Sequence, residues 1–103
     1  MIKVTIKQEG NEIKSLSVTG HALYAKYNED IVCAGVSAIV FGGINAMEDY
    51  KDDIDIIQKE NELGFIVNKS NPNLQLIINT IIVQLKTIEE SYSKNIKIIY
   101  GGV

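Results

Sequence analysis

The stretch "IVCAGVSAIVFGGINAM" (residues 31–47) decides the fold. It runs for 17 residues without a charge and is apolar on nearly every side. A strand is rarely this long, so the stretch predicts a buried helix. Gly35, Gly42 and Gly43 each weaken a helix by roughly 1 kcal/mol relative to alanine. We therefore expect close packing against a neighbouring element to compensate for them.

The residues before this helix predict a β-hairpin. Apolar and polar residues alternate over 2–7, which is typical of a half-buried strand. Leu16 and Val18 alternate with polar residues in the same way, and Gly10-Asn11 between the two runs is suited to a turn. Residues 20–30 are polar and irregular, and they predict a loop.

The residues after this helix predict a second hairpin and a second helix. The segments "DIDII" at 53–57 and "GFIV" at 64–67 flank the turn-like "KENELG". Asn71 is a good N-cap and Pro72 suits the first helical position. The apolar residues that follow recur at spacings of three and four: Leu74, Ile77, Ile78, Ile81, Leu85 and Ile88.

A short strand at 96–100 completes the order ββαββαβ. The pattern predicts an α+β fold in which two helices pack on a mostly antiparallel sheet. With 103 residues and no linker or repeat, residues 1–103 are expected to form a single domain.

Composition and charge exclude several functional classes. The net charge is −3, and the ten basic residues, all lysine, form no block, so direct nucleic-acid binding is not expected. No apolar stretch reaches the ~18 uninterrupted residues of a membrane span, and the N-terminus lacks a signal peptide's apolar region. A single cysteine cannot form an intramolecular disulfide, which fits a reducing, cytoplasmic compartment.

The only histidine, His21, and the only cysteine, Cys33, flank one polar segment. Asp30 stands where an N-cap of the helix belongs, which would place Cys33 in the first turn. Unpaired N–H groups and the helix dipole favour a thiolate there. His21 ends the second predicted strand, and the eleven residues between it and Cys33 can bring the two together. The sequence thus permits a His–Cys pair at a helix start.

Plainer interpretations of these residues stay open at this point. A lone cysteine among Ile31, Val32 and Ala34 is more often a small buried apolar residue. Ser37, one turn after Cys33, either bonds back to a helix carbonyl or lines the floor beneath the thiolate.

The roles of the two tyrosines in this segment also stay open, and the segment offers too few ligands for a metal. Tyr24 and Tyr27 either contact a ligand or fix the loop to the core. One histidine and one cysteine make at most half of a zinc site, so no metal is expected.

The stretch "GHALYAKYNEDIVCAGVSAIVFGGINA" resembles the signature of the ribosomal-processing cysteine protease family, Prp. That family carries Gly-His-Ala, a short loop, and Asp-Ile-Val-Cys-Ala followed by a helix of small residues. "VQLKTIEESYSKNIKI" is similar to the family's C-terminal helix and the strand after it. The resemblance therefore spans essentially the whole chain.

The resemblance implies a function and a set of site residues. The family removes a short N-terminal extension from large-subunit ribosomal protein twenty-seven, cutting after an aromatic residue. Its nucleophile and base correspond to Cys33 and His21, and its motif aspartate and serine to Asp30 and Ser37. It also implies a homodimer, which fits the surplus apolar surface of the helix at 31–47. No cofactor is implied.

The expected mechanism is peptide hydrolysis through a thioester, with backbone N–H groups near Cys33 and Ala34 as candidates for the oxyanion hole. Selectivity would come from a groove under the 22–29 loop. Family members commonly have glycine where this chain has Asn28, which suggests a positive φ there that asparagine tolerates.

Two other classes of function remain possible from the sequence. A non-catalytic ribosome-associated module of the same fold would have an unreactive Cys33. A thiol-based redox or transfer enzyme is a weaker alternative, because the chain has no resolving cysteine.

Overall fold

The computed structural model describes residues 1–20 and 27–102, and only the backbone of residues 27–30. The elements in chain order are β1 (Ile2–Glu9), β2 (Glu12–Thr19), α1 (Tyr27–Ala46), the 3₁₀ helix η1 (Glu48–Asp53), β3 (Ile54–Lys59), β4 (Glu62–Val67), α2 (Pro72–Ser91) and β5 (Ile96–Gly102). The predicted order ββαββαβ is confirmed, with η1 as an addition that the sequence did not indicate.

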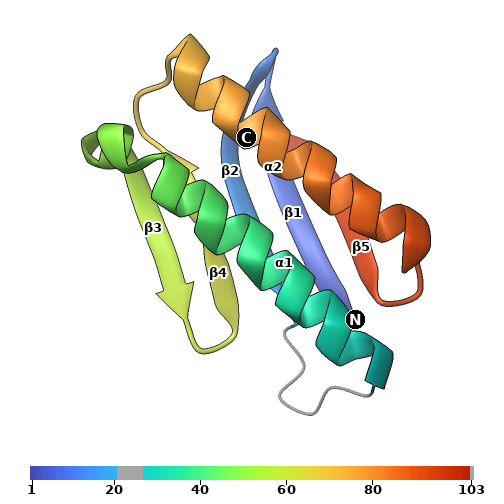
Figure 1. Cartoon of the computed structure of the whole chain (residues 1–103). Helices are drawn as coiled ribbons and strands as arrows, with labels where there is room; N and C mark the ends of the chain where they lie inside the picture. The colour runs from blue at the N-terminus through green and yellow to red at the C-terminus, as the bar shows by residue number, and fades with distance from the viewer. Residues whose placement is uncertain (21–26, 103) are drawn as a thin grey trace.

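The five strands form one sheet in the order β3-β4-β2-β1-β5. β1–β2, β2–β4 and β3–β4 pair antiparallel, and only β1–β5 pair parallel, as the fold prediction required. Both helices lie on the same face of this sheet and run antiparallel to each other (Figure 1). The structure is therefore two layers, and the core lies between the helices and one sheet face.

β1 and β2 each bury the side chains that point to one face of the sheet. Ile2, Val4 and Ile6 of β1 lie in the core, as do Leu16 and Val18 of β2. The residues between them face the side without helices, where water solvates them. The period-two pattern thus correctly assigned the two faces of the first hairpin.

Helix α2 follows its prediction closely. The Asn71 side chain accepts a hydrogen bond from the Leu74 backbone N–H at 2.8 Å, and Pro72 is the first helical residue. The predicted apolar stripe lies against the core, although Ile77 and Ile88 are half-buried. Ile82, which the prediction left out of the stripe, is buried with it.

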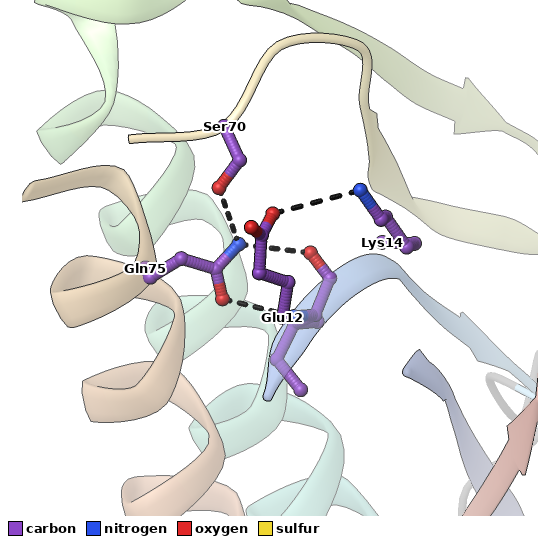
Figure 2. Close-up of polar contacts among 5 residues, drawn as sticks. Glu12, Lys14, Ser70 and Gln75 are labelled. Atoms are coloured by element: carbon purple, nitrogen blue, oxygen red, sulfur yellow. Dashed lines mark hydrogen bonds and ion pairs between the residues drawn. The ribbon is translucent and has the colours of Figure 1, made fainter. Parts of the chain in front are cut away.

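At the start of β2, a side chain of α2 supplies the hydrogen bonds that a neighbouring strand would otherwise make. β2 pairs with β4 only from Ser15 to Thr19, so Ile13 lies beyond that ladder. The Ile13 N–H donates to Gln75 Oε1 at 2.9 Å, and Gln75 Nε2 donates to the Ile13 carbonyl at 3.0 Å (Figure 2). Gln75 Nε2 also donates to Ser70 Oγ at 2.9 Å. Backbone groups left unpaired in a part-buried position would cost free energy, so this amide fixes α2 on the first hairpin.

Helix α1 differs from its prediction at both ends. It runs from Tyr27 to Ala46 rather than from residue 31 to 47, and residues 27–30 belong to the helix and not to the predicted loop. Polar residues are tolerated in the exposed first turn of a helix, so the end of the apolar run did not mark its start. Met47 is buried but lies outside the helix.

The helix is also not buried all round. Among the α1 side chains that the structure describes (residues 31–46), only Val32, Val36, Val40 and Ile44 are buried. No third layer of described residues covers the outer side of the helix.

The expected close packing is present at Gly43, where a Cβ would meet the Ile81 side chain of α2, and at Gly35, where it would lie 3.2 Å from Ile88. The expectation is wrong for Gly42, where a Cβ would meet nothing within 4 Å. A hollow between the two helices is lined by no charged residue. No helix in the described part of the chain is long and apolar enough to cross a membrane.

Candidate functional site

Cys33 lies on α1 at the border between the core and the surface. It is half-buried and packs against the core cluster. It is the seventh residue of α1, in the second turn, whereas the sequence predicted the first turn. The helix dipole acts mainly within the first turn, so the argument from the helix start does not apply to Cys33.

The predicted N-cap role of Asp30 is wrong. α1 begins at Tyr27, so the backbone of Asp30 is already helical. An N-cap residue has non-helical backbone angles and stands before the first helical residue. The correspondence of Asp30 to the family's motif aspartate stays a prediction that does not involve capping.

The predicted oxyanion hole at Cys33 and Ala34 is wrong as well, because their backbone N–H groups are not free in this helix. Only the first four N–H groups of a helix lack a partner, and later ones bond to the carbonyl one turn earlier. Cys33 and Ala34 are the seventh and eighth residues of α1. Donors for an oxyanion have to come from other groups.

The expected positive φ at Asn28 is likewise wrong. Asn28 is the second residue of α1, and no described residue other than glycine has a positive φ. The argument that only glycine or asparagine suits this position therefore fails. Of the other predicted loop residues, Tyr27 starts α1, while His21 and Tyr24 lie outside the described residues.

Ser37 follows Cys33 by one helical turn and is half-buried. Thr80 and Thr87 of α2 donate to the carbonyls four residues earlier, at 2.8 and 2.9 Å. Within the described residues, Ser37 donates no such bond. Its side chain lines a surface hollow of about 190 Å³, together with Phe41, Gln58, Lys59 and Leu63.

Sequence reasoning missed Gly20, which directly precedes His21. Gly20 follows the last residue of β2 and has φ of 78°. A Cβ on Gly20 would meet the Met1 carbonyl oxygen and lie 3.6 Å from the Ile2 Cα. Both observations require glycine, so this residue sets the direction in which the chain leaves β2 toward His21. The Gly-His pair was visible in the sequence, but the nearness of Met1 was not.

With the geometry described, the chain can be compared with known proteins. The family model "Cysteine protease Prp" matches residues 1–97. The chain belongs to the Prp cysteine protease family. It is therefore a cysteine protease, as the signature around His21 and Cys33 predicted.

Two curated relatives of the Prp family show the same full-length likeness. The ribosomal processing cysteine protease Prp of Staphylococcus aureus (strain Mu50) is 36% identical over 103 residues, covering 96% of both chains. The protein of the same name from Bacillus subtilis (strain 168) is also 36% identical, covering 95% of this chain and 96% of its own.

Solved Prp structures have the same fold. A crystal structure of the S. aureus protease with a substrate peptide is 34% identical, has a TM-score of 0.89 and covers 98% of this chain and 100% of its own. Another, with a covalently linked product peptide, has a TM-score of 0.85 at 36% identity and the same coverage.

Proposed function

We propose that this protease uses Cys33 as nucleophile and His21 as general base to remove an N-terminal extension from large-subunit ribosomal protein twenty-seven. One observation carries the proposal: the chain has one cysteine and one histidine. A cysteine protease needs a thiol nucleophile, and here no other residue supplies one. Cys33 is half-buried and stands one helical turn before Ser37, which lines a surface hollow, and this position supports access to a peptide.

The chemistry proceeds through one covalent intermediate. His21 takes the thiol proton, and Cys33 Sγ attacks the scissile carbonyl carbon. The C–N bond breaks, the leaving amine receives the proton from His21, and the acyl group remains on sulfur as a thioester. Water, deprotonated by His21, then attacks the thioester and releases the carboxylic acid and the free thiol.

The substrate assignment rests on the relatives. They are named ribosomal processing proteases, and the resemblance implies cleavage after an aromatic residue of the extension. Residues 1–103 would act as a single protease domain in the cytoplasm, where ribosomal precursors are made, and no cofactor takes part in this chemistry.

The test is direct cleavage of the precursor. The host's ribosomal protein twenty-seven, purified with its native N-terminus, is incubated with the protease and its mass is measured. We expect loss of a short N-terminal peptide that ends in an aromatic residue. A matched precursor with that aromatic residue changed to aspartate should stay intact. A native N-terminus without an extension, or equal cutting of both precursors, would contradict the assignment.

We also propose that two copies associate through the outer surface of α1 and α2. A hollow of about 560 Å³ lies between the helices, lined mostly by small and apolar residues and by no charged one. Leu76 beside it is 68% exposed, and Val83 on the same helix is 63% exposed. A ridge and a hollow on one surface suit a twofold interface, in which each copy presents both.

The assembly prediction is tested by light scattering at micromolar concentration. Wild type should have the mass of a dimer, and Leu76→Asp should have the mass of a monomer, because a buried unpaired carboxylate opposes association. Ile99→Asp, on the sheet face without helices, is the matched control and should remain dimeric. A monomeric wild type, or a dimeric Leu76→Asp protein, would refute this interface.

A further inference from the structure

The sheet has two outer edges, and side chains of α2 occupy the one at β5. The Ile98 N–H of β5 donates to Glu89 Oε2 at 2.7 Å, and Lys86 Nζ lies 5.2 Å from the centre of the Tyr100 ring. An uncovered strand edge offers unpaired backbone groups to any extended chain, and covering side chains prevent that pairing. The edge at β5 is therefore not the place where a further strand would bind.

The edge at β3 has no such cover among the described residues, and β3 pairs only with β4. The Asp53 carbonyl, just before β3, accepts a hydrogen bond from the Asn68 N–H at 2.8 Å. Because backbone bonds alternate along an antiparallel pair, every second residue from Asp53 onward bonds to β4. The N–H and C=O groups of the residues between them, Ile54, Ile56 and Gln58, therefore point away from the sheet.

Apolar side chains accompany these outward backbone groups. Ile56 points to the helix side of the sheet, because it pairs with the buried Phe65, yet it is 52% exposed. Neither helix covers β3 on that side (Figure 1). Ile57 points to the opposite side and is half-buried. The edge thus offers main-chain hydrogen bonds and apolar contacts to an extended peptide, which are the requirements for binding by strand addition.

Carboxylates gather at the start of this edge. Residues 48–55, which comprise η1 and the first two residues of β3, contain five acidic residues and one lysine. η1 has no buried residue. Lys51 pairs with Glu48 at 3.5 Å, and in the described part of the chain no lysine lies within ion-pair distance of the other four carboxylates. This side of the edge is therefore negatively charged and attracts a segment that carries lysine or arginine.

We propose that the β3 edge docks an extended, basic segment of the precursor as an added strand, with the carboxylates of residues 48–55 holding its lysine and arginine side chains. The inference rests on the proposed function, because it takes the precursor to be a ribosomal protein. Such a protein binds RNA phosphates with lysine and arginine, so its chain is rich in basic residues. A second copy of this chain, with its net charge of −3, lacks that complementarity.

The position of the edge supports the same occupant. Gln58 and Lys59, at the end of β3, line a hollow together with Ser37 of α1. Ser37 stands one turn from Cys33, which is about 6 Å along the helix axis. An extended chain advances ~3.3 Å per residue. A precursor held at Cys33 therefore reaches β3 within a few residues, and the docked segment lies beyond the residues that flank the scissile bond.

The experiment separates docking from cleavage by using two substrates. One is the whole precursor of ribosomal protein twenty-seven, and the other is a peptide with only about four residues on each side of the scissile bond. Ile56→Pro removes the outward N–H and leaves the bonds between β3 and β4, because Ile56 does not donate to β4. It should lower kcat/KM for the precursor at least tenfold, through a higher KM, and change that for the peptide less than twofold. Ile56→Val, which keeps the N–H, should match wild type on both substrates.

A second variant tests the charge. Asp52→Asn combined with Asp55→Asn removes two carboxylates, and an asparagine at position 55 can still accept the 2.9 Å bond from Asn68 Nδ2. It should lower kcat/KM for the precursor at least threefold at low salt and equal wild type at about 0.5 M salt, because screening removes the attraction. If Ile56→Pro cuts the precursor as fast as wild type, or loses the same factor on both substrates, no strand is added at β3 and the proposal is wrong. A precursor that wild type leaves intact would instead contradict the proposed function.

Discussion

Cys33→Ala should reduce peptide cleavage by about a thousandfold or more while the protein stays folded. The nucleophile and its base act as a unit, and removing either one from such a pair eliminates most of the rate enhancement. The expected structural cost is small, about 1 kcal/mol, because Cys33 is only half-buried and alanine favours the helix. The measurements are product formation by mass spectrometry and a thermal melt of each protein.

Four further proteins make this result specific. His21→Ala should lose activity to the same extent, and the double variant should be no worse than either single one. Wild type alkylated with iodoacetamide should also be inactive, because Cys33 is its only thiol. Ile99→Ala should retain full activity. Residual cleavage at more than a tenth of the wild-type rate in Cys33→Ala would remove Cys33 from the mechanism.

The elements that the sequence predicted well carry their own start and stop signals. α2 has an N-cap at Asn71, proline at its first position and an apolar stripe, and all three are local properties. The turn at Gly10-Asn11 is similar, since Gly10 has φ of 59° and joins β1 to β2. Local chemistry suffices for such boundaries because the residues that define them are neighbours in the chain.

The start of α1 was mispredicted because no comparable signal exists there. Apolar patterning reports which helical residues face the core, and the apolar run begins only at Ile31, four residues after the start of α1. Asp30 is an acceptable cap by residue type, but the helix continues through it to Tyr27. Two predictions drawn from the cap, the oxyanion donors and the placement of Cys33 in the first turn, failed with it.

Some parts of the candidate site can be identified from neighbouring residues in the sequence, and others form only when distant segments fold together. The identities of His21 and Cys33 are local, because the signature around them is continuous in sequence. The hollow beside Ser37 combines α1 with the tip of the β3–β4 hairpin, some twenty residues later. Nothing in either segment alone indicates that they face each other, so the hollow could not be predicted from the sequence.

Gly20→Ala is the second large effect, and it acts through the backbone. Gly20 has φ of 78°, a conformation that costs a residue with a Cβ roughly 1–2 kcal/mol. The added Cβ would also meet the Met1 carbonyl oxygen, a backbone atom of the residue that directly precedes β1. Two costs therefore add, and we expect a loss of about 2–4 kcal/mol in the free energy of unfolding.

The chain offers a matched control for the first of these costs. Gly10 also has a positive φ, 59°, but a Cβ there would meet nothing within 4 Å. Gly10→Ala should therefore lose only the conformational cost, about 1–2 kcal/mol. The difference between the two variants in urea unfolding measures the contact with Met1.

Activity separates a positioning role of Gly20 from a merely structural one. Gly20 precedes His21, and a base displaced by about 1 Å can lose a hundredfold in rate. With folded protein held constant at low temperature, Gly20→Ala should lower kcat at least tenfold with little change in KM, whereas Gly10→Ala should keep wild-type kinetics. The pH profile of kcat should change only in Gly20→Ala, because only there does the environment of His21 change. If both folded variants cut the peptide at the wild-type rate, Gly20 serves the fold alone, and the direction of the chain at the end of β2 does not limit catalysis.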